Sequence, residues 1–103
     1  MKEKIFVIRK DVGDKVGRIV EIDNTLRALQ EAVDGHIEPF RIGTDAVILC
    51  DEEGKLKGKT VNCRVLGETF VGTILVVGTE GEDFTDCPVD LDDWQRYWLG
   101  RQV

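Results

Sequence analysis

The sequence predicts an α+β domain whose sheet is mixed but mainly antiparallel, with about five to six strands, one helix packed on a face and a second helix at the C-terminus. Short segments rich in β-branched residues recur between Gly-containing turns, as in Lys4–Arg9 and Thr44–Cys50. Leu26, Leu29 and Val33 instead recur at helical spacing. Strands of this kind beside one early and one late helix are typical of the α+β class.

The N-terminal part predicts a β-hairpin followed by a helix. Lys4–Arg9 and Gly17–Ile22 are the two strands, and the polar, Gly-containing stretch between them is the turn. Asn24 or Thr25 can cap the helix, because a short side-chain oxygen accepts a hydrogen bond from a free backbone N–H. We expect Gly35 to end the helix in a left-handed conformation.

The middle of the chain predicts strands separated by turns. Pro39 lacks the N–H that a central strand donates, so it should lie on an edge strand or at a bulge. The run Ile74–Val77 does not alternate with polar residues, which predicts a central strand covered on both faces. Gly72 indicates a bulge or a close backbone approach. The predicted strands are His36–Ile42, Thr44–Cys50, Val61–Leu66 and Thr69–Val77, with a turn at Asp51–Gly54.

The C-terminal segment, residues 85–103, predicts a loop and a helix. Pro88 and Asp90 favour a helix start, and aspartates in the first turn suit the positive end of the helix dipole. Leu91, Trp94 and Trp98 fall on one face of this helix. They are the candidate interface residues, and the alternative is that the two indoles close the domain's own core.

Length and composition predict one domain over residues 1–103, located in the cytoplasm. Apolar runs such as Ile74–Val77 are far shorter than the roughly 20 residues that span a bilayer, and the first residues are not typical of a signal peptide. The three cysteines have no C-x-x-C spacing, so we expect reduced thiols. We expect no membrane partner.

Charge is unevenly distributed along the chain. Residues 80–93 contain seven acidic and no basic side chains, whereas residues 54–64 contain four basic and no acidic ones. Both segments are interpreted as solvated surface, or one of them meets a charged partner. A symmetric dimer in which the two segments meet is a further prediction.

No residue pattern indicates catalysis, a metal site or a cofactor. His36 is the only histidine, and nothing in its spacing pairs it with a cysteine as a nucleophile and base. The acidic turn at Asp51–Glu53 fails the EF-hand pattern, since lysine stands at position 55. Gly54–Thr60 ends in G-K-T but lacks the upstream glycine of a phosphate-binding loop.

The segment of residues 54–64, called the basic turn below, is the best candidate for binding an anionic ligand. Cations in a Gly-rich turn can surround phosphate oxygens together with free backbone amides. Extended nucleic acid is not expected, because the wider surface is not basic and no aromatic stacking platform is evident. The candidate ligand-binding residues are Lys55, Lys57, Lys59, Asn62 and Arg64.

Several motifs resemble an uncharacterised family of small proteins, a domain-of-unknown-function family found in phages, plasmids and other mobile elements of Gram-positive and gut bacteria. The resemblance covers about residues 18–84. The motifs are N-T-L-x-x-L-Q at Asn24–Gln30, E-E-G-K-L at Glu52–Leu56, Asn62, and G-T-x-L-V-V-G at Gly72–Gly78. The resemblance implies an accessory protein of a mobile element and no assigned catalytic residues.

The functional prediction is a non-enzymatic protein of a phage or related element that acts by binding a host protein or complex. The alternative is a protein that sequesters an anionic metabolite or nucleotide at the basic turn. The absence of a catalytic constellation and the separated charges favour binding over turnover.

Overall fold

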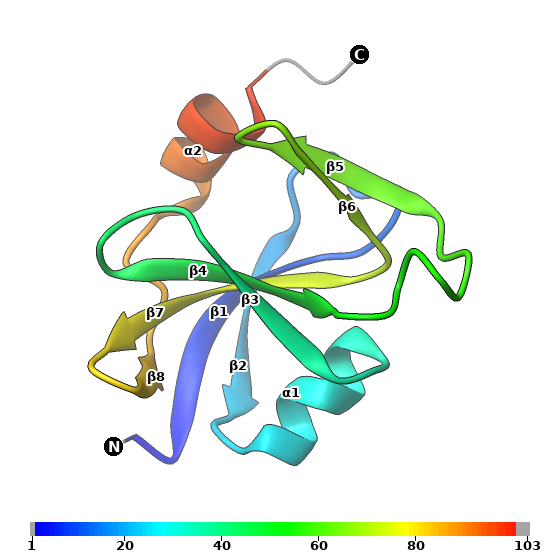
Figure 1. Ribbon diagram of the computed structural model, residues 1–103. Helices are drawn as coiled ribbons and strands as arrows, with labels where there is room; N and C mark the ends of the chain where they lie inside the picture. The colour runs from blue at the N-terminus through cyan, green and yellow to red at the C-terminus, as the bar shows by residue number, and fades with distance from the viewer. Residues whose placement is uncertain (1, 101–103) are drawn as a thin grey trace.

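The chain folds around a six-stranded antiparallel sheet, and the computed structural model describes residues 2–100 (Figure 1). The strand order is β2-β1-β7-β4-β3, with β8 paired to β7 off this path, and β5 and β6 form a separate hairpin. The strands are β1 (Lys4–Lys10), β2 (Arg18–Asp23), β3 (Ile37–Arg41), β4 (Ala46–Asp51), β5 (Val61–Val65), β6 (Glu68–Val71), β7 (Ile74–Glu80) and β8 (Asp83–Thr85). The helices are α1 (Leu26–Val33), α2 (Leu91–Asp93) and the π-helix η1 (Trp94–Leu99), which follows α2 directly.

The predicted α+β class is confirmed, including the helix on one face and the helix at the C-terminus. All pairs between the described strands are antiparallel. No helix within residues 2–100 is long and apolar enough to cross a membrane.

The central position of β7 is confirmed. This strand lies between β1 and β4, and Ile74–Val77 are all 0% exposed. Pro39 lies on β3 at an edge of the sheet, as its missing N–H predicts. The prediction of one strand over Thr69–Val77 is wrong, because β6 and β7 belong to different sheets. Gly72, with φ of 70°, interrupts the extended backbone between them.

The sheet has a different cover on each face, as Figure 1 shows. Helix α1 packs on one face, and the β5–β6 hairpin and the C-terminal helices pack on the other. The first face buries Ile5, Val7, Leu29, Val33, Val47, Leu49, Leu75 and Val77. The second buries Ile8, Ile42, Ala46, Ile48, Cys63, Val65, Phe70, Ile74, Val76, Trp94 and Leu99.

Helix α1 begins as predicted and ends differently. Thr25 is the N-cap, and its Oγ1 accepts a hydrogen bond from Ala28 N at 3.1 Å. The prediction that Gly35 adopts the left-handed conformation is wrong, since Asp34 does so, with φ 57° and ψ 53°. Aspartate tolerates this region better than most residues. Gly35 is required for another reason, a close approach to Asp51.

The C-terminal helix starts as predicted, and Asp90 caps it by accepting a hydrogen bond from Asp93 N at 2.8 Å. Trp94 is 0% exposed, and its indole N–H donates to Val16 O at 3.0 Å. Trp94 therefore closes the domain's own core and has no surface for a direct partner contact. Leu91 and Trp98 are partly buried against the same core. Residues 101–103 of the predicted C-terminal segment lie outside the described residues.

Candidate functional site

The basic turn that the sequence singles out is largely occupied by contacts within the chain. The ammonium groups of Lys57 and Lys59 both lie 2.8 Å from Oδ2 of Asp51, at the end of β4. The Asp51 side chain is only 1% exposed, and its Oδ1 accepts a hydrogen bond from Glu53 N at 3.0 Å. We call Asp51, Lys57 and Lys59 the Asp51 cluster.

The Asp51 cluster holds the C-terminal end of α1 against the sheet. Lys59 Nζ also donates to the backbone carbonyls of Val33 and Asp34, at 2.9 and 2.8 Å. These are carbonyls that a helix C-terminus leaves without an intrahelical partner. Gly35 packs directly on the carboxylate, where a Cβ would lie 2.3 Å from Cγ of Asp51.

Within the Asp51 cluster, the pKa values of Asp51 and Lys57 are shifted. Burial by itself raises the pKa of Asp51, but hydrogen bonds from Lys57, Lys59 and Glu53 N outweigh it and hold the pKa well below its ordinary value. The hydrogen bond to Asp51 raises the pKa of Lys57. Asp51 and Lys57 are therefore charged at neutral pH, and the cluster is a structural ion-pair network.

The remaining candidates from the turn do not join this cluster. Lys55 Nζ lies 3.3 Å from Oε1 of Glu68, and the two side chains are 62% and 46% exposed. Arg64 lies on the exposed side of β5 and donates to Gly67 O at 3.4 Å. The structure thus does not gather Lys55, Lys57, Lys59, Asn62 and Arg64 around one ligand position.

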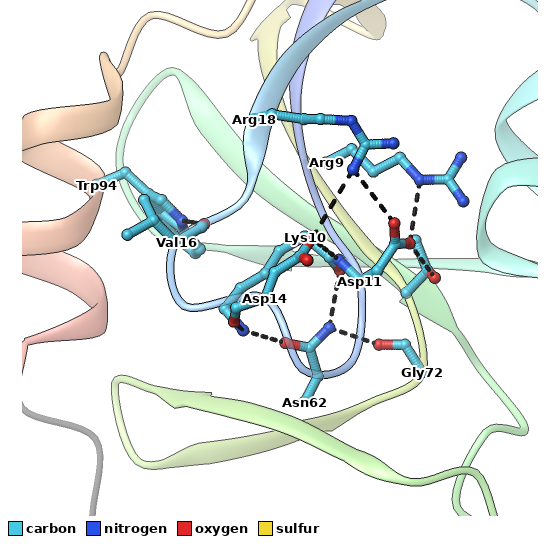
Figure 2. A network of polar contacts seen from close by, with 10 residues as sticks. Arg9, Lys10, Asp11, Asp14, Val16, Arg18, Asn62, Gly72 and Trp94 are labelled. Atoms are coloured by element: carbon cyan, nitrogen blue, oxygen red, sulfur yellow. Dashed lines mark hydrogen bonds and ion pairs between the residues drawn. The ribbon is translucent and has the colours of Figure 1, made fainter.

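Asn62 takes part in a different network, centred on Lys10 (Figure 2). Lys10 is the last residue of β1 and is only 3% exposed. Its ammonium group donates to Asn62 Oδ1 at 2.8 Å and to the backbone carbonyl of Asp14. The amide of Asn62 donates to Lys10 O and Gly72 O, each at 2.8 Å, so Asn62 positions Lys10 from β5.

The acidic residues of the β1–β2 turn are committed to other partners. Asp11 accepts hydrogen bonds from Thr73 at 2.7 Å and from Arg9 at 3.1 Å. The Thr73 hydroxyl, followed by the arginines Arg9 and Arg18, holds the pKa of Asp11 below its ordinary value despite partial burial. Asp14 Oδ2 accepts from Asp11 N at 3.0 Å and lies 3.8 Å from Arg18.

Lys10 is consequently a buried cation with neutral acceptors. Within residues 2–100, no carboxylate oxygen lies within 4.0 Å of its Nζ. An ammonium group has three donors, and the described residues supply two acceptors. Lys10 borders a cavity of about 360 Å³, which is lined by Lys10, Asp14, Lys15, Asn62, Gln95, Leu99 and Gly100.

The sequence prediction missed Lys10, although a signal for it exists. Alternate residues of a strand face the same side, so Lys10 shares a face of β1 with Ile8, which is completely buried. A charged residue at an inward position of a strand indicates a special environment. The partner Asn62 is on a strand 52 residues away and could not be inferred from this pattern.

The residues considered for nucleophilic chemistry lie apart from this cavity or within the core. Burial raises the pKa of all three thiols, that of Cys50 to about 11. Neutral pH therefore leaves them mainly protonated. His36 lines a separate groove between α1 and the basic turn, together with Lys57. Among residues 2–100, no group of three or more histidine, cysteine or acidic side chains is placed to hold a metal ion.

A comparison with known protein families gives one match. The model of DUF3846, a domain of unknown function, matches residues 1–99, and the chain belongs to this family. No curated protein and no solved structure matches the chain.

Proposed function

We propose that this DUF3846 protein is a non-enzymatic binding protein of a phage or other mobile element, and that it holds a small anionic ligand in the cavity that Lys10 borders. We call this position the Lys10 site, defined by Lys10, Asn62 and the cavity that they line. The observation that carries the proposal is the buried ammonium group without a neighbouring carboxylate among the described residues.

Energetics support an anion at this position. A buried charge is costly unless a partner of opposite sign compensates it. Asn62 and the carbonyl of Asp14 orient the ammonium group but carry no net charge. An anionic group in the cavity would supply the missing charge and accept the remaining N–H of Lys10.

The shape of the Lys10 site favours a small molecule over a polymer. Its volume of about 360 Å³ is near the lower end of the range of about 300 to 1,000 Å³ typical of small-molecule sites. β1 and β5, which Asn62 joins, contribute Lys10 and Asn62 to the lining, and η1 contributes Gln95 and Leu99. A site built largely on regular elements is preorganised for binding.

The direct test is the thermal stability of the protein with and without anions. A ligand that binds only the folded state stabilises it by about 2.7 kcal/mol at a concentration of about 100 times Kd. We expect phosphate or sulfate to raise Tm in the wild type and not in Lys10→Met. Lys4→Met is the matched control, because Lys4 is an exposed lysine of the same strand.

A shift that persists in Lys10→Met, with circular dichroism showing a native fold, would contradict the proposal. So would a wild-type Tm that no anion changes. Lys10→Arg separates charge from shape, since it keeps the cation but alters its hydrogen-bonding geometry.

A second candidate function is the binding of a host protein. Phe6 and Ile19, on β1 and β2, are 49% and 50% exposed. The register pairs Ile8 with Ile19, so Ile19 and Phe6 lie on the same face of the sheet as diagonal neighbours. Ile19→Glu should abolish capture of a host protein from lysate and leave the anion-dependent Tm shift unchanged.

The symmetric dimer stays a prediction. Trp94 cannot contribute to such a contact, because it is completely buried in its own chain. The predicted dimer contact is left with Leu91 and Trp98, the acidic segment 80–93 and the basic segment 54–64. Light scattering over a series of salt concentrations tests the dimer, and a monomer at low salt would contradict it.

A further inference from the structure

We infer that the ligand of the Lys10 site is a phosphate monoester, and that Gln95 is the side chain that distinguishes it from free phosphate. This inference rests on the proposed function. It adds the ligand's chemical class and a specificity residue, which the cavity itself indicates.

The charge of the cavity lining favours a dianionic ligand. Lys10 and Lys15 are its two cations, and for neither does a carboxylate of residues 2–100 lie within 4.0 Å. The one acidic side chain in the lining, Asp14, accepts a hydrogen bond from Asp11 N and lies 3.8 Å from Arg18. Two uncompensated cations match a dianion, and a phosphate monoester carries a charge of about −1.5 to −2 at neutral pH.

Of the two amide side chains in the lining, only Gln95 has N–H groups available to a ligand. Asn62 has no N–H to offer a ligand, because its amide already donates to Lys10 O and to Gly72 O. Gln95 is the other amide side chain of the lining, and it is exposed. Its carboxamide has two donors and an acceptor, which suit the hydroxyl groups of an organic substituent.

The π-helical geometry of η1 places Gln95 in the lining of the cavity. A π-helix closes i→i+5 hydrogen bonds, and Gly100 N donates to Gln95 O at 2.8 Å in this way. The wider turn brings Gln95, Leu99 and Gly100 to the same side of the helix, where all three line the cavity. Trp94 and Leu99 are buried, so η1 is anchored and holds Gln95 over the Lys10 site.

The arrangement divides the recognition between two parts of the ligand. Lys10, which is buried, and Lys15, which is exposed, would bind the phosphate oxygens. Gln95 would contact the organic part. Free phosphate has no such part, so its affinity should not depend on Gln95.

Isothermal titration calorimetry with four probes tests this: inorganic phosphate, ribose 5-phosphate, acetate and ATP. We expect ribose 5-phosphate to bind most tightly. Gln95→Ala should weaken ribose 5-phosphate about fivefold to tenfold, the loss typical of one hydrogen bond, and leave inorganic phosphate within about twofold. Lys15→Met should weaken both phosphates. Gln30→Ala, an amide of α1 outside the cavity, is the matched control and should change neither affinity.

Three results would overturn this inference while the proposed function still holds. In the first, acetate or ATP binds more tightly than ribose 5-phosphate. In the second, ribose 5-phosphate binds wild type and Gln95→Ala with equal affinity, and in the third, Gln95→Ala loses affinity equally for ribose 5-phosphate and inorganic phosphate. In each case binding still requires Lys10. If no probe binds, or if binding survives Lys10→Met, the proposed function itself fails.

Discussion

The contact between Gly35 and Asp51 leads to a prediction about stability. Replacing Gly35 by alanine places a Cβ 2.3 Å from Cγ and Oδ1 of Asp51 and 2.6 Å from Oδ2. Gly35 is not at positive φ, so alanine causes no backbone strain of its own. The whole cost of Gly35→Ala therefore comes from the displaced carboxylate.

The expected loss follows from two contributions. Overpacking of a filled site costs about 1 to 3 kcal/mol, and moving the carboxylate weakens charged hydrogen bonds from Lys57, Lys59 and Glu53 N, each worth about 1.5 to 3 kcal/mol when complete. We expect Gly35→Ala to lower the free energy of unfolding by about 3 kcal/mol in total. Asp51→Ala should cost about 3 kcal/mol, the low end for breaking a buried ion pair, because Lys57 is 44% exposed.

The two changes should not be additive. Asp51→Ala removes the three atoms that the new Cβ would meet, so in that background Gly35→Ala should be neutral or stabilising by up to about 1 kcal/mol. The coupling energy between the two positions is then about 3 to 4 kcal/mol.

Urea denaturation of the wild type, the two single variants and the double variant measures this cycle. Gly43→Ala is the control, because a Cβ there meets only Asp45 Oδ1, at 4.0 Å. If Gly35→Ala costs the same in both backgrounds, the contact with Asp51 is not the reason for glycine at this position.

Three further predictions concern titration and backbone conformation. Hydrogen bonds to the Asp51 carboxylate outweigh its burial and lower its pKa. The ionised carboxylate therefore stabilises the folded protein above the ordinary carboxyl pKa, and this stabilisation is lost as pH falls below that value. Between about pH 7 and pH 3, the urea midpoint should fall more steeply for wild type than for Asp51→Asn. Since burial raises the pKa of Cys50 to about 11, iodoacetamide at about pH 8 should alkylate Cys50 and Cys63 much more slowly in the folded protein than in urea, and equal rates by peptide mass spectrometry would contradict this. Leu66 has φ of 51° and is 65% exposed, so Leu66→Asn should raise the free energy of unfolding by up to about 1 kcal/mol, and a decrease would speak against strain at this residue.

The positions of the main strands and the start of α1 could be predicted from the sequence because their causes are local. The unbroken apolar run Ile74–Val77 indicates burial on both faces wherever its neighbours come from. Thr25 caps α1 through a hydrogen bond to a residue three positions away. Pro39 lacks an N–H whatever surrounds it, which predicts an edge strand or a bulge, and β3 lies at the edge.

The break between β6 and β7 and the role of Gly35 required the tertiary structure. Thr69–Val77 has the composition of one strand, and only the pairing of its halves with different partners divides it. Gly35 follows a helix, where glycine commonly adopts positive φ. The neighbouring β4 explains it instead, because the Asp51 carboxylate occupies the space of a Cβ.

The candidate site shows the same division most clearly. By itself the sequence determined which residues carry charge, and it correctly marked residues 54–64 as basic. It could not determine which of those charges remain available, because Lys59 finds acceptors 25 and 26 residues away, and Lys10 and Asn62 are 52 residues apart. Side-chain charge is a property of the residue, whereas burial and pairing depend on segments that meet only when the sheet has formed. The tertiary structure therefore pairs Lys57 and Lys59 with Asp51 and leaves Lys10, at the end of a strand, as a buried cation.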